Sequence, residues 1–319
     1  MATVTGQLQT YNVGNYVGPL FHLQATETPL LSSIGGMNGG RQTSSPEFTW
    51  VTQGNRSPGQ NVAAEGADAT FEGQDREPHE NITQIHQEGI EISYTKLAAI
   101  GQLADDAFTD IDTSAAHILG NQAVQDEMAH QTRLRIEAIG RDINYSFHNG
   151  TYNRATSDSD ERQTRGILNA ISTNTVDMTS DPLSKDAIDE LLRDMYDDED
   201  APMRMLTIFC RAFNKQRISN IYGYAPQHRN LGGLNIETIE TDFGLLGVVL
   251  DRDIPKDTVG FYELSVMAPV FLPTPGKGAM FTEPLAQTGS ALKSQIYTDV
   301  GLEYGPEQWH GKIVNTATS

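Results

Sequence analysis

Residues 122–147, QAVQDEMAHQTRLRIEAIGRDINYSF, carry a sustained helical pattern. The apolar residues recur at spacings of three, four and their sums, as on one face of a helix: Val124, Met128, Ile136, Ile139, Ile143 and Phe147. Asn121 can cap the start, and Asn149-Gly150 can end the helix. At 1.5 Å per residue this helix is about 40 Å long. It therefore predicts an element that spans a whole domain.

Shorter helices and strands are predicted on the C-terminal side of this stretch. A helix over 184–196 has Ser184 as its N-cap, and a second helix runs over 211–222. Apolar runs at 206–210 and 245–250 have the length and β-branched content of strands, and alternation predicts further strands over 296–304 and 309–314. The pattern as a whole predicts an α+β fold without repeats.

The first 45 residues have the composition of an arm. Glu27 and Arg41 are their only Asp, Glu, Lys or Arg residues, and glycines and prolines interrupt the sequence repeatedly. The apolar residues of this segment have no sustained period. We therefore expect them to pack on a part that is already folded, such as a neighbouring copy.

The next segment predicts a long projecting hairpin. Residues 48–52 and 90–94 alternate like strands, and the polar stretch 54–80 between them contains no lysine. A structureless loop of that length is uncommon inside a compact domain and is usually functional or disordered. We therefore expect the hairpin to leave the body of the chain.

Charge and cysteine content exclude several classes of protein. Lys plus Arg is 22 and Asp plus Glu is 42, so the formal charge is 22 − 42 = −20, which argues against sequence-specific DNA binding. The lone Cys210 excludes an internal disulfide and a multi-cysteine metal site. There is no run of 18 apolar residues and no leader pattern at the start, so we expect an unexported protein without a membrane segment.

Motifs that would carry chemistry are incomplete. Gly276-Lys277-Gly278 lacks the spacing of a phosphate loop, and the pairs His79/Glu80 and His86/Glu88 lack a third metal ligand. Asp197-Asp198-Glu199-Asp200 lacks the spacing of a calcium loop, and Cys210 lies in an apolar run. We therefore expect no catalytic site, no metal and no cofactor, and interpret the chain as an assembly subunit rather than an enzyme.

Several blocks together resemble the major capsid protein family of tailed double-stranded-DNA bacteriophages. Their order and spacing match over roughly the first 175 residues. The blocks are Glu27-Thr-Pro-Leu-Leu-Ser-Ser-Ile-Gly-Gly36, Glu47-Phe-Thr-Trp50, Asn81-Ile-Thr-Gln-Ile-His-Gln-Glu-Gly-Ile-Glu-Ile-Ser-Tyr94, Asp126-Glu-Met-Ala-His-Gln131, Arg141-Asp-Ile-Asn-Tyr-Ser-Phe-His-Asn-Gly150 and Thr164-Arg-Gly-Ile-Leu168.

The resemblance implies the tailed-phage and herpesvirus capsid fold of the Hong Kong ninety-seven type. It assigns the segments as follows: an N-terminal arm at 1–45, an extended hairpin loop at 46–95, a peripheral domain at 96–183 with its spine helix at about 121–149, an axial domain at 184–264, and C-terminal strands at 265–319 that complete both domains.

The function implied is that of a major capsid protein, which self-assembles into pentamers and hexamers and forms the icosahedral head around the phage genome. It is made in the host cytoplasm and ends in the virion. The residues expected at contacts between subunits lie in the arm and the hairpin: Tyr11, Tyr16, Phe21, Phe48, Trp50, Arg56, Glu65, Phe71, Arg76 and Glu77.

Two departures from the wider fold family bear on its partners. Some members join subunits covalently through a hairpin lysine, and Pro46–Thr95 contains none, so we expect non-covalent contacts. Some members carry an internal scaffolding segment before the first block, and here that block begins near residue 11. We therefore expect a separate scaffolding protein, together with a portal, a possible decoration protein, and DNA that is enclosed without sequence-specific binding.

Three alternatives remain at this point. One is an encapsulin-like shell of the same fold around a cargo protein. Another is a metal-dependent hydrolase that uses the carboxylates of residues 181–200, where nine acidic and two basic residues give −7. Solvated surface charge is the commoner role of such a block. A tail or fibre protein is disfavoured because no period repeats.

Overall fold

The computed structural model describes residues 16–17, 27–54, 56, 58–69, 73–98, 103–104, 127–157, 159–222, 227–231 and 234–318. The chain divides into two compact units. The first comprises Met1–Thr26, Gln87–Ile139 and Thr282–Ile296, and the second comprises Glu27–His86, Gly140–Phe281 and Tyr297–Ser319. No helix among the described residues is long and apolar enough to cross a membrane.

A seven-stranded sheet lies in the second unit. Its strands are β7 (Thr175–Asp177), β8 (Leu206–Cys210), β9 (Gln227–Leu231), β10 (Leu234–Thr241), β11 (Gly244–Leu250), β12 (Val259–Glu263) and β16 (Gly311–Val314). Their order is β7-β16-β12-β8-β11-β10-β9. Every residue of β8 and β12 is buried, as expected for central strands with continuous apolar runs. The strands predicted at 206–210 and 245–250 are confirmed.

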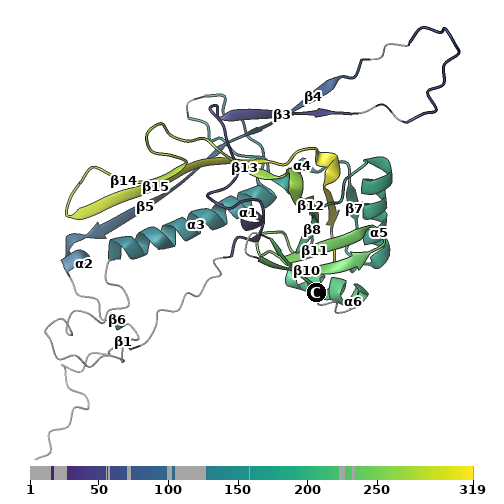
Figure 1. Ribbon diagram of the computed structural model, residues 1–319. Coiled ribbons are helices and arrows are strands. Elements are labelled where there is room, and N and C mark those ends of the chain that lie inside the picture. The colour runs from purple at the N-terminus through teal and green to yellow at the C-terminus, as the bar shows by residue number, and fades with distance from the viewer. Residues whose placement is uncertain are drawn as a thin grey trace, which may run out of the picture. The chain divides into compact units, whose positions relative to one another are not determined.

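Two helices pack against this sheet (Figure 1). They are α5 (Lys185–Arg193), which continues as a π-helical turn over Asp194–Asp198, and α6 (Ala212–Tyr222). The Ser184 hydroxyl accepts a hydrogen bond from the Ala187 amide at 3.2 Å, which confirms the predicted N-cap. Leu191 of α5 and Ile218 of α6 belong to one buried cluster with the sheet, so both helices share its core.

A second sheet contains five strands. They are β14 (Met280–Pro284), β15 (Ala291–Glu303), β13 (Ala268–Phe271) and β2 (Arg41–Gln42) in that order, and β5 (Gln84–Ser93), which pairs with β15. The strand predicted over 296–304 is confirmed as the second half of β15, which ends at Glu303. The strand predicted over 309–314 begins at Gly311, because the 3-10 turn Glu307–Trp309 precedes it.

The hairpin pairs differently from the sequence-based expectation. Strand β3 (Glu47–Gln53) pairs antiparallel with β4 (Arg76–Ile82), from Glu47 opposite Ile82 to Gln53 opposite Arg76. The expectation that 90–94 forms the second arm is wrong, because those residues belong to β5 and α2. Strand β4 was missed because it reads REPHENI, whose alternating residues are polar and give no apolar period.

The long helix α3 (Glu127–Asn149) ends where the sequence predicts, and its predicted first turn at 121–126 lies outside the described residues. Ile139, Ile143 and Phe147 are buried as expected. Ile136 is 38% exposed, so its assignment to the buried stripe is wrong.

The remaining elements are short. They are β1 (Tyr16–Val17), β6 (Leu103–Ala104), α1 (Pro29–Ser33), α2 (Tyr94–Ala98), α4 (Ile167–Ala170) and a 3-10 turn over Leu264–Val266. Leu30 and Leu31 of α1 are buried, and the Leu31 amide donates to Asn144 Oδ1 at 3.0 Å. This piece of the predicted arm therefore packs on its own chain.

A buried polar network joins α3 to the sheet. His148 Nε2 lies 3.0 Å from Asp251 Oδ2, and His148 Nδ1 lies 3.2 Å from the Tyr262 hydroxyl. Asn144 Nδ2 donates to Asp253 Oδ2 at 2.6 Å and also reaches Asp251. Burial alone would raise the pKa of Asp251, but the bonds from His148 and its neighbours leave that pKa below its ordinary 3.8. The network therefore holds a carboxylate in the core.

His310 ties the turn before β16 into the core. The Glu263 amide donates to His310 Nδ1 at 3.1 Å, so Nδ1 carries no proton and Nε2 donates to the Tyr304 carbonyl at 2.6 Å. The ring is fully buried, and burial lowers the pKa of His310 from 6.5 to about 4. The neutral ring therefore accepts one hydrogen bond at Nδ1 and donates one at Nε2.

We expect Asp251→Asn to lower the free energy of unfolding by about 2–4 kcal/mol, because it removes the buried charge that pairs with His148. Urea denaturation at pH 7 measures this. Asp68→Asn, at an exposed position of the hairpin loop, is the control and should change stability by less than about 0.5 kcal/mol. Equal stability of the two variants would contradict the structural role of the network.

Stability should also fall as the pH is lowered from 6.5 to 4. In that range the unfolded chain takes up a proton at His310, but the folded chain does not, so folding loses up to about 3 kcal/mol at this residue. Below pH 4 this contribution is constant. Urea midpoints across the range should show a shallower slope for His310→Gln than for the unaltered chain. Identical slopes would show that His310 titrates freely.

Candidate functional site

The residues predicted at subunit contacts lie mainly along the hairpin. Phe48 and Trp50 belong to β3, Arg76 and Glu77 belong to β4, and Arg56 and Glu65 lie in the loop between the strands. Tyr16 lies in β1, where only the backbone is described. Tyr11, Phe21 and Phe71 lie outside the described residues.

Trp50 anchors the base of the hairpin to the chain's own core. Its indole Nε1 donates to the Gly305 carbonyl at 2.9 Å, and its ring meets the Tyr304 ring edge-on at 4.8 Å between centroids. The ring of His79, on strand β4, stacks against the Trp50 indole, with 6.1 Å between the ring centroids. Sequence reasoning found Trp50 but could not find its partner, which lies 255 residues away.

The turn that receives Trp50 has a fixed shape. Gly305 has φ +67°, and a Cβ there would lie 2.9 Å from the Val266 side chain. His310 holds the Tyr304 carbonyl, and Asn174 Nδ2 donates to the carbonyls of Gln308 and His310. The turn is therefore rigid at the point where the hairpin docks.

A second contact comes from the segment that follows α3. Arg154 Nε lies 2.6 Å from Glu47 Oε1 at the start of β3. The Tyr152 hydroxyl donates to Glu80 Oε1 on β4 at 3.3 Å. Burial and the neighbouring Glu80 raise the pKa of Tyr152. Both strands are therefore held at their base by side chains of one chain.

The opposite face of the hairpin contacts Arg154 and Tyr152 through Glu47 and Glu80 at its base and is exposed further along the ladder. Thr49, Val51 and Gln53 are exposed on β3, and Val51 is 58% exposed. Val51 lies opposite Pro78 in the ladder, which makes an apolar pair on this face. Pro78 has no amide hydrogen, so the outer edge of β4 is a poor template for unspecific strand pairing.

The loop beyond the ladder is exposed throughout its described residues, which are 54, 56, 58–69 and 73–75. Val62 is 84% exposed. Beside the loop lies an open cavity of about 1000 Å³. The charged residues that line it are Arg56, Asp75, Glu77 and Glu199. Its lining is polar, so we assign no ligand to it.

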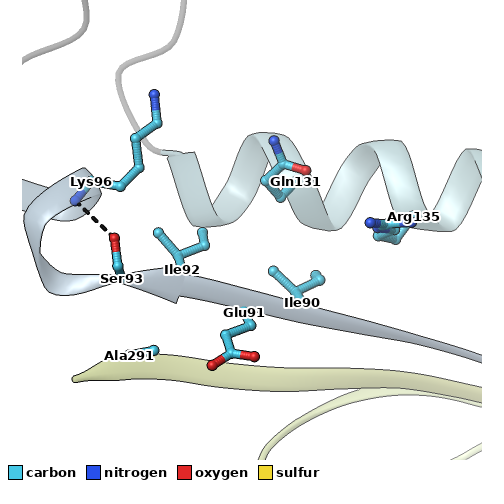
Figure 2. A pocket seen from close by; sticks show the side chains of 8 residues that line it. All are labelled: Ile90, Glu91, Ile92, Ser93, Lys96, Gln131, Arg135 and Ala291. Atoms are coloured by element: carbon cyan, nitrogen blue, oxygen red, sulfur yellow. Dashed lines mark hydrogen bonds between the residues drawn. The ribbon is translucent and has the colours of Figure 1, made fainter. Parts of the chain in front are cut away.

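A further cavity, of about 600 Å³, lies in the first unit (Figure 2). Ile90 and Ile92 point from β5 toward α3, and Glu91 points away from them toward β15, as Figure 2 shows. The charges here are paired: Arg135 contacts Glu88 at 3.1 Å, and Lys293 contacts Glu91 at 3.4 Å. Ile90 and Ile92 are apolar, and Arg135 and Glu91 are paired with neighbouring side chains. We therefore assign no catalytic role to this cavity.

Buried nucleophiles and bases elsewhere are inaccessible. Burial raises the pKa of the Cys210 thiol to about 12, so it packs as an apolar side chain, as predicted. His148, Asp251 and Tyr262 are at most 2% exposed, which excludes a substrate from them. Among the described residues, no group of three His, Cys, Asp or Glu side chains is arranged to hold a metal ion.

Solved structures with the same fold are shells. The chain is similar to the capsid of cyanophage A-1(L), with a TM-score of 0.62, 11% identity and coverage of 99% of this chain and 100% of the other. It is similar to Gordonia phage Cozz, with a TM-score of 0.56, 11% identity and coverage of 98% and 93%. The encapsulin complex of Synechococcus elongatus PCC 7942 matches with a TM-score of 0.56, 11% identity and coverage of 87% and 85%.

These likenesses confirm the Hong Kong ninety-seven type of capsid fold but do not separate a phage head from a cargo shell. No curated protein matches the chain. The distinction comes from the family described as SU10 major capsid protein, which matches residues 3–317. The chain therefore belongs to the SU10 major capsid protein family, as a structural subunit that forms the phage head and not as an enzyme.

Proposed function

We propose that this major capsid protein assembles non-covalently into pentamers and hexamers, and that the hairpin of each copy lies on a neighbouring copy. The observation that carries the proposal is the contrast between the two faces of the hairpin. One face is docked through Trp50 on the turn at Tyr304 and Gly305, whereas the other face, beyond its contacts through Glu47 and Glu80, exposes Val51 and Pro78. A two-stranded ladder is marginal alone, so a neighbouring surface is needed to cover it.

The residues of the proposed contact follow from this geometry. Arg56, Glu65, Arg76 and Glu77 are exposed on the loop and on β4, where a neighbouring copy can reach them. Phe48 and Trp50 set the direction of the hairpin from within one chain. For the arm we retain Tyr11, Tyr16, Phe21 and, in the loop, Phe71 as proposed contact residues.

The proposed partners follow from charge and composition. Pro46–Thr95 contains no lysine, so a covalent bond from a hairpin lysine is excluded and the contacts are non-covalent. A net charge of −20 opposes tight binding of DNA, which we propose is enclosed rather than bound. A separate scaffolding protein, a portal and a decoration protein complete the proposed set. The segments 96–183 and 184–264 are proposed as the peripheral and axial domains.

Size-exclusion chromatography of the full chain, expressed alone and with its neighbouring viral genes, should give an early fraction. Negative-stain electron microscopy of that fraction should show rings of five and six or closed uniform shells. DNA in the shells supports the head, whereas a single co-purifying cargo protein would favour a cargo shell. A stable 35 kDa monomer under all salt and crowding conditions would contradict the proposal.

Two adjacent residues separate docking from assembly. Trp50→Ala should lower the free energy of unfolding by about 2–3 kcal/mol, because it removes a half-buried ring and its hydrogen bond. Val51→Asp, on the outward face, should leave unfolding unchanged within about 0.5 kcal/mol but prevent assembly, because it buries a charge at the contact.

Val51→Thr is the matched control, since it keeps the shape of the side chain and should still assemble. Thermal unfolding and electron microscopy measure the two effects. If Val51→Asp assembled like the unaltered chain, the outward face would not be a subunit contact.

A further inference from the structure

We propose that the seven-stranded sheet and its helices carry two complementary docking surfaces at opposite ends of β11, which join neighbouring copies head to tail. One surface is apolar with an acidic rim, and the other is basic. The partner is a second copy of this chain. The inference rests on the proposed function, because it places one contact within the rings of that assembly.

The first surface lies where β11 begins. Tyr196, after α5, is 56% exposed, and Leu245 of β11 is 51% exposed. The Tyr196 ring lies 6.1 Å from the ring of Phe243, which is in the turn between β10 and β11. We call these three side chains the apolar patch. Exposed aromatic and aliphatic side chains that gather in this way mark interaction surfaces.

Carboxylates adjoin the apolar patch along the chain: Asp197 and Asp198 follow Tyr196, and Asp242 precedes Phe243. Asp197, Asp198 and Asp242 are exposed, and neither 194–200 nor 240–245 contains a lysine or an arginine. Burial and the carboxylates of Asp189 and Asp242 raise the pKa of Tyr222, the last residue of α6, to about 12. An apolar centre with an acidic rim fits a partner of opposite charge.

The second surface lies at the other end of α6. Residues 211–222 contain three cations and no carboxylate: Arg211, Lys215 and Arg217. The Arg217 guanidinium lies 5.3 Å above the Phe213 ring, so this surface also has an aromatic component.

The turn after β11 adds two exposed cations to this surface, although Asp251, which is buried, Asp253 and Asp257 make the net charge of residues 251–258 negative (2 − 3 = −1). Arg211 Nε donates to the Ile254 carbonyl at 2.7 Å, and Asn214 Nδ2 donates to the Lys256 carbonyl at 3.3 Å. These bonds place the start of α6 beside this turn, where Arg252 and Lys256 are exposed. Asp257 is the exposed carboxylate of residues 251–258.

The two surfaces are well separated and different. Strand β11 has seven residues, so at 3.3 Å per residue its first and last Cα atoms lie about 20 Å apart. A contact of one acidic surface with another would bring carboxylates together and be unfavourable. A contact of acidic with basic surface is heterologous, and heterologous contacts that close produce rings.

Charge reversal tests the pairing in the full-length chain. The basic-side variant carries Arg252→Glu and Lys256→Glu, and the acidic-side variant carries Asp197→Arg and Asp242→Arg. The assembled fraction of each should fall about tenfold or more, because like charges now meet. A chain with all four substitutions should assemble again, since the pairing is restored with its polarity reversed. Size-exclusion chromatography and electron microscopy measure the assembled fraction.

A matched control separates pairing from net charge. Arg133→Glu on α3 with Lys277→Glu in the turn between β13 and β14, both at exposed positions, changes the net charge by the same amount as the basic-side variant, and neither residue belongs to the seven-stranded sheet or to α5 and α6. This control should assemble like the unaltered chain. The thermal unfolding temperature of every variant should lie within about 2 °C of that of the unaltered chain.

Mixing the two one-sided variants gives a further readout. Acidic-only chains can alternate with basic-only chains, so the mixture should form rings of six but not rings of five. The inference is overturned if the one-sided variants assemble normally or if the fourfold variant stays unassembled. Failure of the unaltered chain to assemble would instead overturn the proposed function.

Discussion

The hairpin of this subunit depends on the burial of Trp50 against the turn at Tyr304 and Gly305. Seven ladder pairs cannot form a core of their own, so the direction of the hairpin is set only where it touches the body. The Trp50 hydrogen bond and edge-on aromatic contact supply that direction, together with the contacts of Arg154 with Glu47 and of Tyr152 with Glu80. The described loop residues beyond β3 and β4 are exposed, and we propose that a neighbouring copy covers them.

The turn can orient the hairpin because it is itself fixed. Both ring nitrogens of His310 form hydrogen bonds with backbone groups, and the Asn174 side chain donates to two further carbonyls. Each of these side chains satisfies a buried polar group that would otherwise be costly. Buried histidine and carboxylate groups thus act here as connectors between distant segments. The network of His148 and Asp251 plays the same part between α3 and the sheet.

The periodic elements were predictable from the sequence and the polar ones were not. Helix α5 and strand β8 were found because their apolar spacing reflects a buried face. Strand β4 was missed because its inward residues, His79 and Asn81, are polar and are satisfied by partners on other elements. The Trp50 residue was noticed, but a contact across 255 residues leaves no local pattern. Tertiary hydrogen bonds therefore limited the prediction.

The net negative charge of the chain opposes association between copies, and the local segregation of acidic and basic residues offsets this repulsion. A subunit with 42 acidic and 22 basic residues repels its copies on average. Contacts between copies are then favourable only where charge is segregated at short range, because screening leaves distant charges little effect. Segments 181–200 and 211–222 carry net charges of −7 and +3 within one compact unit. Such segregation lets an acidic protein associate in one orientation and oppose the others.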